Sequence, residues 1–239
     1  MVLSYVGLHN ERQSMAYDVI IVDDHPLYRA ALRSAVAGAC PEAKFHEADS
    51  VAAMFQRLER DPAADLLLLD LNLPGAHGFS ALAYVRGSYP QLPVVVVSAM
   101  DDAATVHQSL AFGAQGFLSK SADATSICEC VRAVLRGELV APESYRALKP
   151  QASDAAALDV AERLADLTPQ QFRVFTMLCS GRLNKQIAHE LDVTEATVKA
   201  HMTAVMRKLG AANRTQAVLL AARLMLNPDD LKPQPEEVD

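Results

Sequence analysis

The chain has 239 residues, of which 51% are hydrophobic, and its formal net charge at pH 7 is −7. This length accommodates two ordinary domains, and the apolar content argues against wholesale disorder. The N-terminus has no signal-peptide pattern, and no run approaches the roughly 18 apolar residues that a membrane span needs. We therefore expect a cytoplasmic protein without a membrane partner.

Five short apolar runs punctuate the first half of the chain. They are residues 18–22, 43–48, 65–70, 93–99 and 116–120, and amphipathic stretches lie between them near 27–38, 50–60, 78–88, 103–113 and 123–137. The first, third and fourth runs are almost continuously apolar, which is typical of strands buried on both faces of a parallel sheet. The alternation predicts an α/β fold with a five-stranded, doubly wound parallel sheet.

Polar residues stand where these runs end. Asp23 and Asp24 follow the first run, Asp70 ends the third, Ser98 lies near the end of the fourth and Lys120 ends the fifth. The carboxyl ends of parallel strands meet at one edge of a sheet, and ligands bind there in such folds. We therefore expect the five side chains to lie close together.

Together these residues suit phosphoryl transfer to a carboxylate. Mg²⁺ prefers oxygen ligands and typically takes one or two carboxylates. A carboxylate can attack phosphorus, while a lysine and a hydroxyl engage the phosphoryl oxygens. Taken singly, each residue also has a structural explanation: Asp24 as a helix cap, Asp70 or Ser98 as turn residues, and Lys120 as a solvated lysine.

Residues 17–137 resemble the receiver domain of two-component response regulators. The resemblance rests on "IIVDDHPLYRAALR", "LLLLDLNLPGAHGFSAL", "VVVVSA" and "GAQGFLSKSA". It implies that Asp70 accepts phosphate from a sensor histidine kinase. It also implies that Mg²⁺ is bound by Asp24, Asp70 and the backbone carbonyl of Asn72, with Asp23 acting largely through water.

The same resemblance assigns the switch residues of the domain. Ser98 would be the switch hydroxyl, Lys120 the phosphate-pairing lysine, and Phe117 the aromatic residue whose rotamer couples to Ser98. Two positions depart from the family's pattern: Ser121 stands where a proline is frequent, and Phe117 lacks the hydroxyl of the more usual tyrosine. His25 and His77 border the site, and we interpret them as polar loop residues.

The second half of the chain has a different pattern. Residues 138–166 lose the strand–helix rhythm and predict a linker, with a helix from about 154 to 166. Residues 167–226 predict four helices near 169–180, 184–191, 195–209 and 214–226. Thr168 and Gln171 form a capping-box pattern, Thr194 is a second cap, and Gly210 ends the third helix. The acidic segment 227–239 predicts disorder.

The charge of residues 167–226 is +5, although the whole chain is acidic. On the third helix of this segment Val198, Met202, Val205 and Leu209 form one apolar stripe, and small and basic residues lie opposite. A basic face beside small residues can approach DNA closely, although a merely solvated basic face is the alternative interpretation.

Residues 167–218 resemble the LuxR-type helix-turn-helix, chiefly through "NKQIAHEL" and "TVKAHMTAVMRKLG". The resemblance places the chain in the NarL/FixJ-like branch and implies double-stranded DNA as partner and a homodimer in the active state. It puts Lys199, Ala200 and Thr203 toward the DNA groove, with Lys185 and Arg207 as phosphate contacts. Thr203 replaces a lysine of the nitrate-responsive members, so a shared operator sequence does not follow.

We predict from these features a phosphorylation-controlled, sequence-specific DNA-binding transcriptional regulator that is not an enzyme. The main alternative is a regulator that binds DNA independently of phosphorylation and uses the receiver as a dimerisation scaffold. An aspartyl phosphatase is a further alternative, but such enzymes need Asp-x-Asp after the first strand. Here Asp23 and Asp24 are adjacent, which argues against that class.

Overall fold

The computed structural model describes residues 16–60, 63–73, 76, 78–142 and 152–222, with the side chains of the last range described from residue 159. The strands are β1 Asp18–Val22, β2 Lys44–Ala48, β3 Leu66–Asp70, β4 Val94–Ser98 and β5 Gly116–Ser119. The helices of the first half are α1 Pro26–Ala39, α2 Val51–Arg60, α3 Ser80–Ser88, α4 Ala103–Ala111 and α5 Ala124–Leu135. They are followed by α6 Ala152–Ala165, α7 Pro169–Cys179, α8 Asn184–Glu190, α9 Glu195–Leu209 and α10 Arg214–Ala222.

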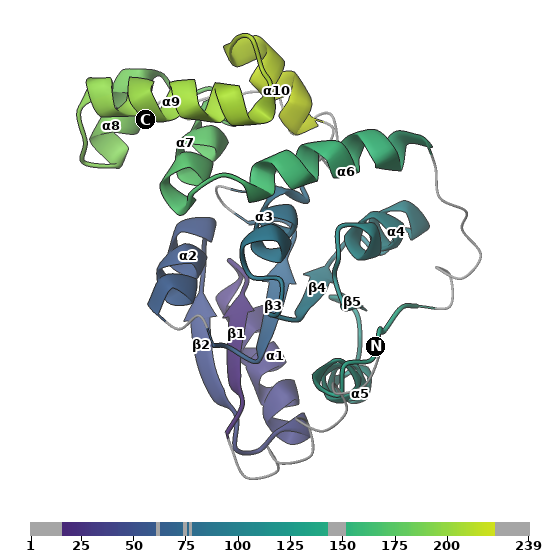
Figure 1. Cartoon of the computed structure of the whole chain (residues 1–239). Helices are drawn as coiled ribbons and strands as arrows, with labels where there is room; N and C mark the ends of the chain where they lie inside the picture. The colour runs from purple at the N-terminus through teal and green to yellow at the C-terminus, as the bar shows by residue number, and fades with distance from the viewer. Residues whose placement is uncertain (1–15, 61–62, 74–75, 77, 143–151, 223–239) are drawn as a thin grey trace, which may run out of the picture.

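The five strands form one parallel sheet with the order β2-β1-β3-β4-β5. This confirms the predicted fold class. Helices cover both faces of the sheet, with α1 and α5 on one side and α2, α3 and α4 on the other (Figure 1). Because successive strand residues point to opposite faces, Val19 and Ile21 pack toward α1 and α5, whereas Ile20 and Val22 join the other core.

Helices α7 to α10 form a compact helical module, residues 169–222. The predicted capping box of α7 is present: the Gln171 N–H donates to Thr168 Oγ1, and the Thr168 N–H donates to Gln171 Oε1. Thr194 caps α9, and Gly210 ends it with a φ of 67°. Local sequence signals therefore mark the start of α7 and both ends of α9.

Helix α6 lies within the segment predicted to be a linker and packs across α3 of the α/β unit (Figure 1). The approach is unusually close at Gly87, since a Cβ added there would lie 1.9 Å from the Cβ of Ala165. On α6 itself, Val160 and Leu164 are fully buried in the same core as the receiver-like sheet. Residues 152–165 of this segment therefore form a docked helix rather than a free tether.

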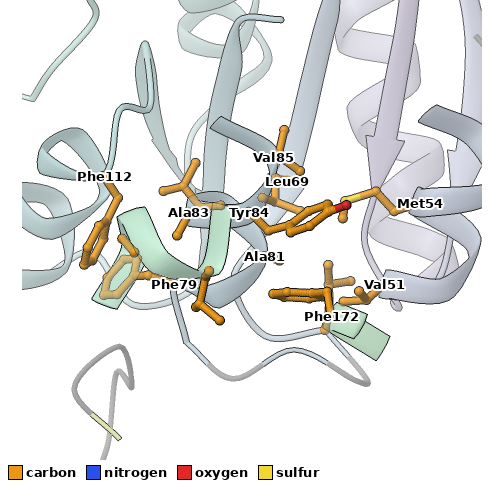
Figure 2. Close-up of a cluster of buried hydrophobic side chains, with 14 of the residues drawn as sticks. Val51, Met54, Leu69, Phe79, Ala81, Ala83, Tyr84, Val85, Phe112 and Phe172 are labelled. Atoms are coloured by element: carbon orange, nitrogen blue, oxygen red, sulfur yellow. The ribbon is translucent and has the colours of Figure 1, made fainter. Parts of the chain in front are cut away.

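An aromatic cluster continues this contact into the helical module. The ring centroid of Phe172 on α7 lies 4.6 Å from that of Tyr84 and 5.4 Å from that of Phe55, which belong to α3 and α2. All three side chains are at most 2% exposed, and Figure 2 shows Phe172 beside Val51 and below Tyr84, with Met54 next to Tyr84. We call these three rings, with the Gly87–Ala165 contact, the aromatic seam.

Two open hollows border the seam where α2 faces the helical module. One of about 250 Å³ is lined by residues that include Glu59 and Arg173, and one of about 370 Å³ by residues that include Ser50, Arg173 and Arg182. Tight packing is thus concentrated at the seam.

The predicted disordered tail, 227–239, lies outside the described residues, and the boundaries of the predicted linker and domains stay predictions.

Candidate functional site

The carboxyl ends of β1 and β3 bring the predicted acidic residues together. Ligand atoms of Asp23, Asp24, His25 and Asp70 lie within 4.8 Å of one another. Asp23 and Asp70 are each only 1% exposed. Burying two carboxylates this close together is costly unless a positive charge compensates them. We call Asp23, Asp24, Asp70 and the neighbouring Lys120 the acidic edge.

Lys120 supplies that compensation. Its Nζ lies 2.7 Å from Asp23 Oδ2 and 2.7 Å from Asp70 Oδ2. The side chain comes from the turn after β5, where the Lys120 backbone N–H donates to the Ser98 carbonyl at 2.7 Å. The sequence-based expectation that these strand ends converge is thus met for both carboxylates and the lysine.

Burial and hydrogen bonding set the protonation of this pair in opposite ways. Burial raises the pKa of Asp70, and the hydrogen bonds from Lys120 and the Asn72 N–H only partly oppose it. For Lys120, burial alone would lower the pKa, but hydrogen bonds to Asp23 and Asp70 outweigh it and the pKa is raised. The contacts of Lys120 therefore favour its protonated form, whereas the surroundings of Asp70 disfavour its ionised form.

His25 lies closer to the carboxylates than its interpretation as a polar loop residue suggests. Its Nδ1 is 2.7 Å from Asp24 Oδ1 and 3.2 Å from Asp23 Oδ1, and its backbone N–H donates to Asp23 Oδ1 at 2.7 Å. His25 is also the N-cap of α1, without a side-chain cap bond, so Asp24 does not serve as that cap. The position of His25 directly after Asp24 in the sequence was the only signal that could have indicated these contacts. His77 lies outside the described residues.

The predicted switch residues Ser98 and Phe117 lie on β4 and β5, which follow β3 in the order of the sheet. Ser98 ends β4 and is 3% exposed, and its Oγ accepts from the Met100 N–H at 3.0 Å, which leaves its own proton uncommitted by that contact. Phe117 on β5 is 3% exposed and belongs to the hydrophobic core that also contains Phe172. The peptide bonds of the described residues, including the one before Ser121, are trans.

The face of α9 that the resemblance turns toward DNA, which we call the reading face, is open to solvent. Lys199, Ala200, Thr203 and Arg207 are all exposed, as is Lys185 on α8. On the opposite side Val198, Val205 and Leu209 are fully buried, as their spacing predicts. The docked arrangement therefore covers none of the predicted DNA contacts.

Some of the basic charge counted for this module serves the fold instead. Lys208 Nζ donates to the Asp166 carbonyl and to Gln171 Oε1, both at 2.7 Å. Arg214 donates to the carbonyls of Leu178 and Arg182. Arg163, on α6 and outside the segment counted, likewise donates to the Leu209 carbonyl at the end of α9 at 2.9 Å. A charge count alone cannot separate such residues from free cations.

Comparison with known proteins agrees with this division of the chain. The response regulator receiver domain family matches residues 19–132, and the luxR family of bacterial regulatory proteins matches residues 165–221. The glycerol metabolism activator of Pseudomonas putida is 37% identical over 210 residues, which cover 86% of this chain and 95% of that protein. The nitrate/nitrite response regulator protein NarL of Escherichia coli K12 is 28% identical over 202 residues, covering 84% and 93%.

Solved structures show the same fold. RcsB from Salmonella enterica serovar Typhimurium, bound to the promoter P1flhDC in the presence of the phosphomimetic BeF₃⁻, superposes with a TM-score of 0.52 at 21% identity, covering 88% of this chain and all of that one. Among the described residues of our chain, no helix has the length and apolar character to cross a membrane. The chain belongs to the response regulators of the NarL-like branch, which join a receiver domain to a LuxR-type domain, and it is a DNA-binding transcription regulator.

Proposed function

We propose that this regulator is controlled by phosphorylation of Asp70 by a sensor histidine kinase in the cytoplasm. The observation that carries the proposal is the contact of a buried Asp70 carboxylate with Lys120 at the edge where two further carboxylates, Asp23 and Asp24, converge. In the transfer step, an Asp70 oxygen forms a bond to phosphorus while the bond to the donor's leaving group breaks, and that group departs with the electron pair. The chain then holds an acyl phosphate and turns over no external substrate.

The acidic edge fits a Mg²⁺ site by the chemistry of its donors. Three carboxylates within reach of one another offer the hard oxygen ligands that this ion prefers. Asp24, Asp70 and the Asn72 carbonyl would hold it directly and Asp23 largely through water. When bound, the ion neutralises charge on the phosphoryl oxygens.

Phosphorylation adds charged oxygens beside Ser98 and Lys120. The Ser98 hydroxyl can donate to a phosphoryl oxygen, and we expect Phe117 on the neighbouring strand β5 to repack within the core in response. Asp70 ends β3, and the following helix α3 carries Tyr84 and Gly87 of the aromatic seam. We place the coupling to the helical module in this β3–α3 connection.

The proposed output is a homodimer on paired half-sites of double-stranded DNA. RcsB, which shares the fold, has been solved on promoter DNA with a phosphomimetic and as dimers on DNA. In our chain Lys199, Ala200 and Thr203 are placed to face the major groove. Thr203 Oγ1 donates its proton to the Lys199 carbonyl at 3.0 Å, so its methyl group and the lone pairs of its oxygen are left for base contact.

A second candidate is a regulator that binds DNA without phosphorylation. The observation that favours it is the exposure of the whole predicted reading face while the module is docked on the receiver. In that case the seam would fix the position of the module, and the receiver would serve as a scaffold for dimerisation.

Labelling by a small phosphodonor tests the first proposal. Full-length protein is incubated with acetyl phosphate and Mg²⁺, and intact mass is measured with and without the Asp70→Asn substitution. We expect one added phosphoryl group on the wild type and none on the variant, and we expect DNA affinity to rise only when the group is present. Equal labelling of both proteins would exclude Asp70 as acceptor. Labelling without any change in DNA binding would favour the second candidate.

The salt dependence of DNA binding tests the reading face. Each phosphate that a cation neutralises contributes about −0.9 to the log–log slope. Arg207→Ala, which removes an assigned phosphate contact, should therefore make the slope shallower by about 0.9, measured by fluorescence anisotropy on a promoter duplex. Lys208→Ala is the matched control, because the Lys208 ammonium is engaged by Asp166 and Gln171 and the slope should not change. The opposite ranking would overturn the assignment.

A further inference from the structure

Tyr28 lies where the acidic edge meets helix α1. It is the third residue of α1, which begins at Pro26 directly after the Asp23–His25 turn. The Lys120 Nζ lies 5.1 Å from the centroid of the Tyr28 ring. At this distance an ammonium over a ring face is attracted by the ring quadrupole. Neither the Asp-Asp pattern nor the spacing of the strands indicates this contact.

The hydroxyl of Tyr28 makes no visible contribution to that geometry. Its oxygen is buried and has no hydrogen-bond partner among the described residues. Burial raises the pKa of the phenol, so the ring stays neutral at any pH at which the protein works. The contact with Lys120 is therefore made by the ring face.

Lys120 needs a contact that survives changes at the carboxylates. Its long side chain loses considerable rotamer freedom when fixed, and its two carboxylate contacts are both at positions that phosphorylation or a bound cation alters. A cation held by Asp23 and Asp24 would compete with the ammonium for the Asp23 carboxylate. The ring of Tyr28 carries no charge that titrates or is displaced, so this anchor persists in both states.

We propose that Tyr28 is a positioning residue that holds the Lys120 ammonium beside Asp70 through its ring face. The inference rests on the proposed phosphorylation of Asp70 for its functional consequence, but the Tyr28–Lys120 contact itself does not depend on it. Phenylalanine keeps the ring, so Tyr28→Phe should preserve the effect. Leucine is of similar apolar character but has no ring face, so Tyr28→Leu should remove it.

The contact is tested directly by NMR on the isotope-labelled full chain without any phosphodonor. A ring face shifts nearby protons upfield, so the Lys120 ε-protons should lie upfield in the wild type and in Tyr28→Phe and move toward the ordinary lysine position in Tyr28→Leu. Unchanged ε-proton shifts in Tyr28→Leu would overturn the proposal. This readout decides the contact even if Asp70 is never labelled, which would count against the proposed function instead.

The functional consequence is measured as the labelling rate with acetyl phosphate and Mg²⁺. We expect Tyr28→Leu to be slower than wild type by roughly 3- to 10-fold, as a lost cation–π contact of ordinary strength implies, and Tyr28→Phe to restore the rate. Phe45→Leu is the matched control, because Phe45 stacks under Arg33 at 5.5 Å on another part of the surface, and its rate should equal that of wild type. Equal slowing in Tyr28→Phe and Tyr28→Leu would assign the effect to the hydroxyl and overturn the ring assignment.

A double-mutant cycle separates positioning from simple packing. The unfolding equilibrium constant of Tyr28→Leu is compared in the wild-type and Lys120→Met backgrounds by urea denaturation. If the ring acts on Lys120, the effect of Tyr28→Leu should be about 3-fold or more smaller when the lysine is absent. Equal effects in the two backgrounds would show that Tyr28 only packs, and would overturn the proposal.

Discussion

The acidic edge and the aromatic seam are both built on the β3–α3 connection, yet different forces hold them. At the acidic edge Asp70 and Asp23 are buried carboxylates balanced by one ammonium. At the seam Tyr84 and Phe172 join two parts of the chain by apolar contact and by a close fit at Gly87. A charge balance responds to any added charge, whereas an apolar fit responds to added volume. One connection can thus receive an electrostatic signal at one end and deliver a packing change at the other.

Removal of Lys120 is the strongest way to test the charge balance. Leaving buried carboxylates without their partner typically costs several kcal/mol, so Lys120→Met should lower the free energy of unfolding by about 3 kcal/mol at neutral pH without Mg²⁺. The measurement is urea denaturation followed by circular dichroism. Added Mg²⁺ should restore much of the loss, because a ligand that binds only the folded state stabilises it. The exposed Lys185→Met substitution is the control and should change stability by less than about 0.5 kcal/mol.

A single methyl group at Gly87 tests the packing of the seam. Alanine in place of glycine normally stabilises a helix by up to about 1 kcal/mol, and Gly38→Ala should do so, because its Cβ would meet only Cys128 Sγ at 3.7 Å. Gly87→Ala should instead cost about 1–3 kcal/mol through overpacking against Ala165. Both glycines are the next-to-last residues of exposed helix ends, in α1 and α3, which makes them a matched pair.

Hydrogen exchange shows where the Gly87 effect is felt. We expect amide protection to fall in α6 and at the start of α7 in Gly87→Ala, with protection of the central strands unchanged. If both alanine variants stabilised the chain equally, the close approach of α3 and α6 would not hold the module in solution.

The smallest effect concerns the pH dependence of stability at Asp70. Because the pKa of Asp70 is raised above its ordinary value, chiefly by burial, the ionised form is penalised in the folded state. That penalty is present above the folded pKa and disappears as the pH falls below the ordinary carboxyl value. Asp70→Asn should therefore stabilise the metal-free protein at neutral pH, and the gain should shrink on acidification. A gain that grew at low pH would mean that Lys120 outweighs burial.

Much of the fold and of the acidic edge was predictable from the sequence. Continuous apolar runs indicate doubly buried strands, and a polar residue at each run's end places Asp23, Asp70 and Lys120 on one edge of a parallel sheet. Helix ends in the second half were predictable because caps such as Thr168 and the left-handed Gly210 are local signals.

Contacts that depend on side-chain direction across long separations were not predictable. Tyr28 and Lys120 are 92 positions apart, and nothing local to α1 indicates that the ring faces the lysine. Phe172 reads as a core residue of its own helix, although it docks on Tyr84 of the receiver. The engagement of Lys208 by Asp166 was hidden for a similar reason, since its charge counts toward a basic face whichever way it points.

The end of α6 is hydrogen-bonded to α9, the helix that carries the reading face, and this has a consequence for the geometry of the operator. Arg163 holds the Leu209 carbonyl, and Lys208 holds the Asp166 carbonyl, so α6 and α9 are joined at two points. In a dimer, a flexible tether would let the second module search for its half-site at an effective concentration set by tether length. With α6 docked on α3, the effective concentration of the second module depends instead on how its half-site is oriented relative to the first. Insertion of half a turn of DNA between the two half-sites should then abolish the gain in affinity from dimerisation rather than weaken it gradually.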